Sequence, residues 1–503
     1  MRFDSHRSSQ LFAAATCQLF LMNMVGCTGL VPGALPPPAS LESIHHIIFL
    51  AQENRSFDHY FGALREYWAQ NRFPDQVFDG LPQFNVPAGA PPTNPGCDPS
   101  LPPPHDCQPS PANPIASYHL NTVCIENPSP SWNESHTDWN LSSPASGTAT
   151  LDGFVRAAGH DSRNQSPPLN DVDGVRATGY YDGTDLNYYY FMASNFATSD
   201  AWFSPVMSRT DPNRMYLIAA TSQGHVHPLN QDLAAPAPPL TAKTIFEELQ
   251  GAGVSWKIYV NSEGTSCSDR DSACLMKLGS ITNFAYAQTI LRQPSLLANI
   301  ASINQYFRDL NNGALPSVAL LEPAYGAGFD EHPSVDDLKP NNIQAGAGYV
   351  ASLINSLMSS PSWKDSVFVL TFDEGGGLYD HVAPVPAVSP DGIPPSDLQP
   401  GDTCSVAPGP NCDFVVTGYR VPLIVVSPFS KKNFVSHGKM DYTAILRLIE
   451  TRFKLPALTK RDAAQPDMSM EFFDFINQPW LTPPVPPQQN QGGACTLTPP
   501  GPG

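Results

Sequence analysis

Five short apolar runs stand far apart along the chain. They are His45–Ala51, Val254–Val260, Ser317–Leu321, Ser366–Phe372 and Val421–Ser427. Each run is bounded by polar residues, proline or glycine, and is continuously apolar instead of alternating. This pattern is typical of strands that are covered on both faces.

Amphipathic segments lie between these runs, at Thr241–Ala252, Ile343–Met358 and Asp441–Phe453. Strands that alternate with helices predict an α/β fold with a mostly parallel central sheet and helices on both faces. Ligands of such sheets bind beyond the carboxyl ends of the strands. Functional residues are therefore expected directly after the apolar runs.

An acidic pair follows the fourth run, because Ser366–Phe372 leads into Asp373-Glu374 and three glycines. Adjacent carboxylates repel each other, and partly buried ones resist ionisation unless a positive partner neutralises them. A divalent cation is the simplest partner, and the glycines allow a sharp turn beside it.

A second acidic motif, Glu53-Asn54, follows the first run. A carboxylate and a carboxamide are oxygen ligands that suit a hard divalent cation. The alternative is a helix start, in which Asn54 caps the helix and Glu53 is solvated.

The segment SPVMSRTDPNRMY places Thr210 close to a helix start, because Pro212 suits an early helical position. Backbone N–H groups at such a terminus favour phosphate binding. Beside a metal, the Thr210 hydroxyl could ionise and attack phosphorus. The alternative is that Thr210 is a plain helix cap.

Three histidines lie close in sequence to acidic residues that could orient them or share a site with them. His381 lies eight positions after Asp373, close enough to share its site. His136, in SHTDWN, and His332, in DEHP, are flanked by acids that could orient an imidazole. The alternative for each is a structural histidine held by hydrogen bonds.

The amino-acid composition limits the kinds of molecule that this protein can bind. The 503 residues include 46 acidic and 27 basic side chains, a net charge of −19. Such a surface repels nucleic acid and anionic membranes at long range, so contact with a membrane surface would be local and transient. The 54 prolines indicate long ordered loops.

We predict one catalytic domain at 28–478, with insertions at about 81–150 and 383–413, and a Pro-rich tail at 479–503.

The first residues resemble an export signal. Leu11–Val25 is apolar, follows Arg2 and Arg7, and is too short for a membrane span. We predict that 1–27 is a signal peptide and that the protein is secreted. A lipid anchor at Cys27, in the sequence MVGC, is the alternative.

Eight cysteines remain beyond the signal segment, and an even number in an exported chain favours disulfides. Cys97–Cys107, Cys267–Cys274 and Cys404–Cys412 would each close a short loop, which leaves Cys124 and Cys495. Free thiols and other pairings stay open, because spacing does not fix connectivity.

Four motifs together resemble a known family. ENRSFDHYFG, TDPNR, DEHP and DEGGGLYDHV, in this order, are similar to motifs of the bacterial phosphoesterase family. That family includes non-haemolytic phospholipases C and an acid-phosphatase branch within the alkaline phosphatase superfamily. The similarity runs from about His45 to about Phe453 and implies an alkaline phosphatase-like fold.

The resemblance implies one divalent metal ion. Its ligands would be Glu53, Asn54, Thr210, Asp373 and Glu374, with Thr210 also the nucleophile. Ligation by oxygen alone favours Ca²⁺, Mn²⁺ or Mg²⁺, whereas zinc would normally attract more histidine.

The resemblance also implies roles near the substrate. His332 would contact the phosphate or protonate the leaving alkoxide. His136 and His381 would be further catalytic or supporting residues, and Asn213 and Arg214 would bind substrate. The chain departs from many members just before the nucleophile, where Ser208-Arg209 replaces Gly-Pro.

The function implied is a metal-dependent phosphoric ester hydrolase of phospholipase C type that acts on phospholipid through a phosphothreonine. The first alternative is an acid phosphatase that uses the same site on phosphomonoesters. The second is an inactive cell-surface binding protein. The sequence does not predict an oligomeric state.

Overall fold

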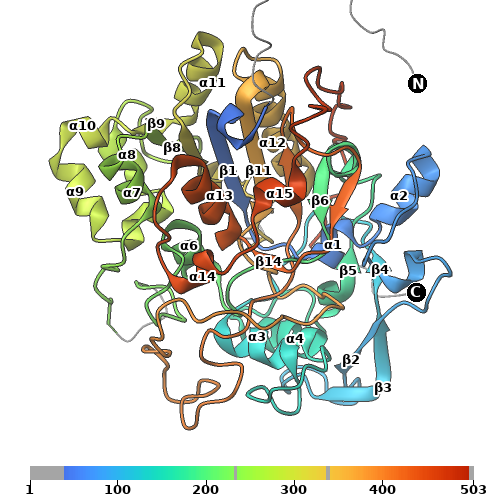
Figure 1. Ribbon diagram of the computed structural model, residues 1–503. Coiled ribbons are helices and arrows are strands. Elements are labelled where there is room, and N and C mark those ends of the chain that lie inside the picture. The colour runs from blue at the N-terminus through green and yellow to red at the C-terminus, as the bar shows by residue number, and fades with distance from the viewer. Residues whose placement is uncertain (1–38, 231–234, 336–339, 498–503) are drawn as a thin grey trace, which may run out of the picture. The chain divides into compact units, whose positions relative to one another are not determined.

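A computed structural model describes residues 39–230, 235–335 and 340–497 (Figure 1). The predicted signal peptide and Cys27 lie outside the described residues. None of the described helices combines the length and the apolar character needed to cross a membrane.

An eight-stranded sheet forms the centre of the described part, in the order β13-β6-β12-β11-β1-β10-β8-β9. Its strands are β1 His46–Gln52, β6 Ala197–Ser199, β8 Trp256–Val260, β9 Ile300–Ser302, β10 Val318–Leu321, β11 Ser366–Phe372, β12 Leu423–Val426 and β13 Phe434–Ser436. Strand β12 runs antiparallel to β11 and β6, and the other described pairs of this sheet are parallel. The predicted mostly parallel α/β fold is confirmed.

The central strands are covered on both faces, since every residue of β11 is buried. Helix α6 (Thr210–Ala219) contacts α7 (Ile245–Gly251) and α13 (Thr443–Phe453), and α11 (Ile303–Asn312) contacts α12 (Ile343–Met358). Burial on both faces explains why the strand sequences are continuously apolar.

Smaller elements complete the described chain. Its other α-helices are α1 Phe57–Phe61, α2 Leu64–Asn71, α3 Trp132–Trp139, α4 Phe154–Asn164, α5 Asn187–Asn195, α8 Ser272–Met276, α9 Tyr286–Arg292, α10 Pro294–Leu297, α14 Lys460–Ala463 and α15 Met468–Phe472. Two-stranded sheets pair β2 (Thr93–Cys97) with β3 (Pro109–Ala116), β4 (Tyr118–His119) with β5 (Gly179–Tyr180), and β7 (Trp202–Phe203) with β14 (Met440–Asp441).

The two predicted insertions lie against each other on one side of the sheet (Figure 1). The indole of Trp132, in α3, donates to the Thr403 carbonyl at 2.9 Å, and Asn133 donates to Asp402 at 2.9 Å. The segment 383–413 has no helix or strand of its own, and it also contacts the loop after α6, where Thr221 donates to Asp391 at 2.6 Å.

Four disulfides join the pairs that the sequence suggested: Cys97–Cys107, Cys124–Cys495, Cys267–Cys274 and Cys404–Cys412. The tail at 479–497 has no helix or strand. It is held by Cys124–Cys495 and by the Val123 N–H, which donates to the Ala494 carbonyl at 2.8 Å.

Candidate active site

Three carboxylates follow the ends of three neighbouring strands. Strand β1 pairs with β10 on one side and β11 on the other, all parallel, and Glu53, Glu322 and Asp373 come directly after them. Because the carboxyl ends of parallel neighbours meet at one edge of the sheet, the acids gather there. Each is 2% exposed or less.

One guanidinium lies among these acids. Arg214, on α6, places Nη2 2.6 Å from Glu53 Oε1, Nε 3.4 Å from Asp373 Oδ2 and Nη1 3.8 Å from Glu322 Oε2. With the buried Glu374, the cluster contains four carboxylates, and the charges of Arg214 and Arg209 act on them. The cluster therefore has an excess of negative charge in a region where charge is costly.

Three oxygens of the cluster have no hydrogen-bond partner. Asp373 Oδ1 accepts from the backbone N–H groups of Asn54 and Glu374, and Glu374 Oε2 accepts from the Gly376 N–H at 2.7 Å. Asp373 Oδ2, Glu374 Oε1 and Asn54 Oδ1 are buried and accept no hydrogen bond, although Asp373 Oδ2 also lies 3.4 Å from Arg214 Nε. Buried polar atoms are normally paired, and carboxylate and carboxamide oxygens are the donors of a hard divalent cation. These residues therefore fit the predicted metal.

Electrostatics within the cluster agree with this fit. Burial, together with the neighbouring Glu53, raises the pKa of Asp373, and burial with Asp373 raises the pKa of Glu374. Burial also opposes ionisation of Glu53, yet Arg214 and then His332 bring the Glu53 pKa below its usual value. A cation beside the unpaired oxygens would relieve this repulsion.

Thr210 is the first residue of α6, and its hydroxyl donates to Glu53 Oε2 at 3.1 Å. The helix cap is Arg209, so Thr210 is not the plain cap that was considered as the alternative. Its side chain faces the acid cluster from the positive end of the helix. A nucleophile and an anion-binding helix terminus thus meet at the carboxyl edge of the sheet.

Asn54 has a left-handed backbone conformation, with φ of 57°, and connects the cluster to His332. The cap of α1 is Ser56, so the alternative reading of Asn54 as a cap is not observed. Asn54 Nδ2 lies 3.1 Å from His332 Nε2. Because an amide nitrogen only donates, Nε2 is the acceptor, and the ring proton lies on Nδ1, toward the Pro333 carbonyl.

The glycines after the acidic pair make the close approach possible. Gly376 and Gly377 have φ of 69° and 70°, which favours glycine. A Cβ on Gly376 would lie 2.4 Å from the Asn54 carbonyl oxygen. The turn that the sequence predicted thus brings Gly376 next to Asn54, and the Gly376 N–H donates to Glu374.

Comparison with known proteins identifies the family. The model of the Phosphoesterase family matches residues 44–456, most of the chain. This chain belongs to the Phosphoesterase family.

Relatives of the phosphoesterase are named phospholipases C. "Phospholipase C B" of Mycobacterium tuberculosis is 31% identical over 486 residues, covering 92% of this chain and 84% of that protein. "Non-specific phospholipase C4" of Arabidopsis thaliana is 30% identical over 431 residues, covering 84% and 70%. Among solved structures, an alkaline phosphatase superfamily protein from Vibrio parahaemolyticus is 11% identical with a TM-score of 0.31, covering 55% of this chain and 63% of that one.

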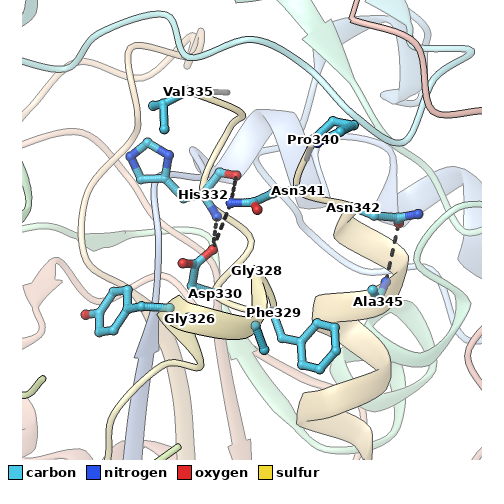
Figure 2. A pocket seen from close by; sticks show the side chains of 12 residues that line it. Gly326, Gly328, Phe329, Asp330, His332, Val335, Pro340, Asn341, Asn342 and Ala345 are labelled. Carbon is cyan, nitrogen blue, oxygen red and sulfur yellow. Dashed lines mark hydrogen bonds between the residues drawn. The ribbon is translucent and has the colours of Figure 1, made fainter. Parts of the chain in front are cut away.

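A pocket of about 500 Å³ opens beside His332 in the phosphoesterase (Figure 2). Its wall includes the rings of Tyr325 and Phe329 and the carboxyl of Asp330. Asp330 Oδ1 accepts from the His332 N–H at 3.0 Å and from Asn341 Nδ2 at 3.2 Å. Burial, with a contribution from Glu53, raises the pKa of Asp330 to about 7. The pocket offers space for part of a substrate on the His332 side.

His136 lies in a different environment. It is fully buried in α3, where Nδ1 contacts the Trp132 carbonyl at 2.7 Å and Nε2 the Asn411 carbonyl at 3.4 Å. Burial lowers its pKa to about 4, so the ring is neutral. These contacts attach the 383–413 insertion to α3, and a catalytic role for His136 stays a prediction.

His381 belongs to a second buried cluster of the phosphoesterase. Its Nδ1 lies 2.6 Å from Asp58 Oδ2 and its Nε2 3.1 Å from Asp79 Oδ1. Arg420 lies 2.8 Å from Asp380 Oδ1 and 3.1 Å from Asp58 Oδ1. The hydrogen bonds of His381 are thus with this ion-pair network, and its role at Asp373 stays a prediction.

The side chain of Asn213 faces the protein. It donates to the carbonyls of Val206, Ser208 and Arg209 and accepts from the Val206 N–H. Asn213 therefore holds the loop before Thr210, as Arg214 holds the acids behind it. Substrate contact by either residue stays a prediction.

Sequence reasoning did not single out Glu322 in the first cluster, or Asp58, Asp380 and Arg420 in the second. Glu322 follows the run Ser317–Leu321 just as Glu53 follows its own strand, so the same rule would have found it. Arg420 has no local signal, because its partners Asp58 and Asp380 are 362 and 40 positions away.

Proposed function

We propose that this protein is a metal-dependent phosphoric ester hydrolase of phospholipase C type. The observation that carries the proposal is a buried acid cluster in which three oxygens accept no hydrogen bond. Glu53 of this cluster accepts from the Thr210 hydroxyl at the start of α6. Membership of the Phosphoesterase family supports the reaction class.

The residues that would hold the cation are Glu53, Asn54, Asp373 and Glu374, with the Thr210 hydroxyl beside Glu53. A divalent ion bound there would lower the pKa of the hydroxyl and neutralise phosphate oxygens. Because the donors are all oxygens, we favour one Ca²⁺, Mn²⁺ or Mg²⁺ over Zn²⁺.

In the first proposed step, Thr210 Oγ1 attacks phosphorus in line with the glycerol oxygen. The Oγ1–P bond forms as the bond from phosphorus to the glycerol oxygen breaks. The hydroxyl proton passes to Glu53 Oε2, which already accepts its hydrogen bond. Arg214 helps to keep Glu53 ionised and therefore able to accept that proton.

His332 is the proposed proton carrier. Beside an anionic phosphodiester, its Nε2 binds a proton and gives it to the departing glycerol oxygen, which leaves as diacylglycerol. The neutral Nε2 then takes a proton from the water that attacks the phosphothreonine. The phosphorylated head group departs, and Thr210 recovers its proton from Glu53.

The proposed substrate is a glycerophospholipid, as the names of the relatives suggest. Rates on phosphatidylcholine micelles and on p-nitrophenyl phosphate separate this activity from an acid phosphatase. Preference for the monoester would replace the phospholipase proposal with the phosphatase. Lack of turnover of both, with and without added metal, would favour an inactive binding protein.

We further propose that the protein acts outside the cytoplasm. Four disulfides support this proposal, because disulfides persist in oxidising compartments.

The Thr210→Val variant tests the mechanism, because valine keeps the shape and removes the hydroxyl. Hydrolysis of phosphatidylcholine should fall on the order of 10⁴-fold or more, as for other nucleophile deletions. The fold and the bound metal, measured by circular dichroism and mass spectrometry, should be retained.

Thr244→Val is the matched control. Thr244 caps α7 by accepting from the Glu247 N–H, outside the candidate site. This variant should lose about 1 kcal/mol of stability and keep its activity. Near-normal hydrolysis by Thr210→Val would exclude a phosphothreonine intermediate.

A further inference from the structure

Glu331, the residue before His332, is a buried carboxylate that the proposed reaction does not use. It is fully buried, and three side chains donate to its two oxygens. Tyr60 donates to Oε2 at 2.6 Å, Gln52 donates to Oε1 at 3.1 Å, and Tyr189 makes a short hydrogen bond to Oε1. The carboxylate is therefore anchored from β1, α1 and α5.

The backbone of Glu331 is also held in an unusual conformation. Its φ is 70°, a region that non-glycine residues seldom adopt. Arg55 donates to the Glu331 carbonyl through both Nε, at 2.8 Å, and Nη2, at 2.6 Å. A Cβ on Gly346 would lie 2.2 Å from Glu331 Cγ, so α12 packs directly against this side chain.

A strained residue persists only where its surroundings fix it, and such residues cluster at functional sites. Here the constrained residue is Glu331, and His332 follows it directly in the chain. The His332 ring in turn meets Asn54, another left-handed residue, at 3.1 Å. The position of the imidazole thus depends on two constrained backbone turns, one from each neighbouring strand.

We propose that Glu331 is a positioning residue, which holds His332 where it can protonate the leaving oxygen. This inference rests on the proposed function, and it adds a residue that does not touch the substrate. If Glu331 positions His332, loss of the Glu331 anchor should slow hydrolysis only of substrates whose leaving oxygen must be protonated. A nitrophenolate leaves without a proton, whereas the alkoxide of diacylglycerol does not.

The test compares kcat/KM on two substrates that share a phosphocholine group. One is short-chain phosphatidylcholine below its micelle concentration, and the other is p-nitrophenyl phosphocholine. This parameter covers only the steps up to departure of the leaving group, so the later attack of water does not enter. Glu331→Gln should lower it about 10–100-fold on the lipid and less than about threefold on the nitrophenyl ester.

Tyr189→Phe is the milder variant, and Tyr188→Phe is its matched control. Both remove a buried hydroxyl from α5, but Tyr188 donates to Asn355 and not to Glu331. Tyr189→Phe should show the same selective loss, about 3–10-fold on the lipid alone, and Tyr188→Phe should not. If Glu331→Gln does not fold, the two tyrosine variants decide the question.

Equal losses on both substrates, or no loss from Tyr189→Phe, would overturn the positioning role and leave the proposed function intact. A wild-type protein that hydrolyses neither substrate would overturn both. Selective loss on the lipid supports the positioning role.

Discussion

Two buried acidic clusters are built from the same two segments of the chain. ENRSFDHYFG and DEGGGLYDHV contribute Glu53, Asn54, Asp373 and Glu374 to one, and they contribute Asp58, Asp380 and His381 to the other. In the second cluster, Arg420 and His381 pair with the carboxylates. In the first, the charges of Arg214 and Arg209 act on four carboxylates, and three oxygens accept no hydrogen bond.

The difference separates a structural cluster from a candidate metal centre. Geometry alone would accept Asp58, Asp380 and His381 as ligands, because their donor atoms lie within 4.8 Å of one another. The guanidinium of Arg420 already occupies that position as the cation. The oxygens without a hydrogen bond, rather than the number of acids, are therefore our reason for proposing the first cluster as the metal centre.

The largest effect is expected from Asp373→Asn, which removes one charged ligand of the first cluster. Activity should fall about a thousandfold or more, because metal catalysis contributes several kcal/mol. Metal content, measured by mass spectrometry, should fall with it. A chelator should inactivate the wild type, and Ca²⁺, Mn²⁺ or Mg²⁺ should restore it.

Asp380→Asn is the matched control, because it changes the same residue type in the second cluster. It should keep the metal content of the folded protein. A control variant that loses metal, or an Asp373→Asn variant that retains it, would show that the two clusters are assigned the wrong way round.

The second largest effect is expected from Arg420→Ala. It leaves Asp380 buried without its cation and Asp58 with only His381, which should cost about 3–5 kcal/mol of unfolding free energy. Urea denaturation measures this loss. The exposed pair Arg65–Asp75 provides the control, since Arg65→Ala should cost less than about 1 kcal/mol. Equal costs would contradict the structural role of the second cluster.

The smallest effect is expected from His381→Gln, and it depends on pH. Burial opposes the charge on His381, but Asp58 and Asp79 raise its pKa from 6.5 to about 10. The stabilisation by this pair is therefore complete below pH 6.5 and is lost as pH rises toward 10. The unfolding free energy of the wild type should exceed that of the variant by about 1.5–3 kcal/mol at pH 6. The two values should become similar at pH 10.

Urea midpoints across this pH range test that prediction. His45→Gln removes an exposed histidine that pairs with Asp365, and it is the control that should cost less than about 1 kcal/mol at pH 6. A difference between wild type and His381→Gln that grows with pH would contradict the sign given above.

The long, continuously apolar elements could be predicted from the sequence. Ser366–Phe372 and Ile343–Met358 have the predicted bounds in the structure, because polar residues, glycine or asparagine end each apolar pattern. The strands β6 and β13 were missed, since segments of three residues show no period. Their pairing depends on the sheet that they join.

The candidate site was predicted only where a residue follows its own strand. Glu53 and Asp373 have that local signal, and the structure brings them together across β1 and β11. The positions of His136 and His381 were not predictable, because their partners lie in segments remote in sequence. The ion pairs between Arg214 and the acids were likewise not predictable, because these residues are also remote in sequence.

The disulfide Cys124–Cys495 joins residues 371 positions apart and so makes a covalent ring of most of the described chain. A single cut by a protease anywhere inside that ring leaves one connected molecule. The ring contains Thr210, His332 and Asp373, whereas Glu53 and Asn54 lie on the segment that precedes it. Cleavage between Asn54 and Cys124, outside the loop that Cys97–Cys107 closes, is therefore the kind of nick that could separate the two halves of the candidate metal centre.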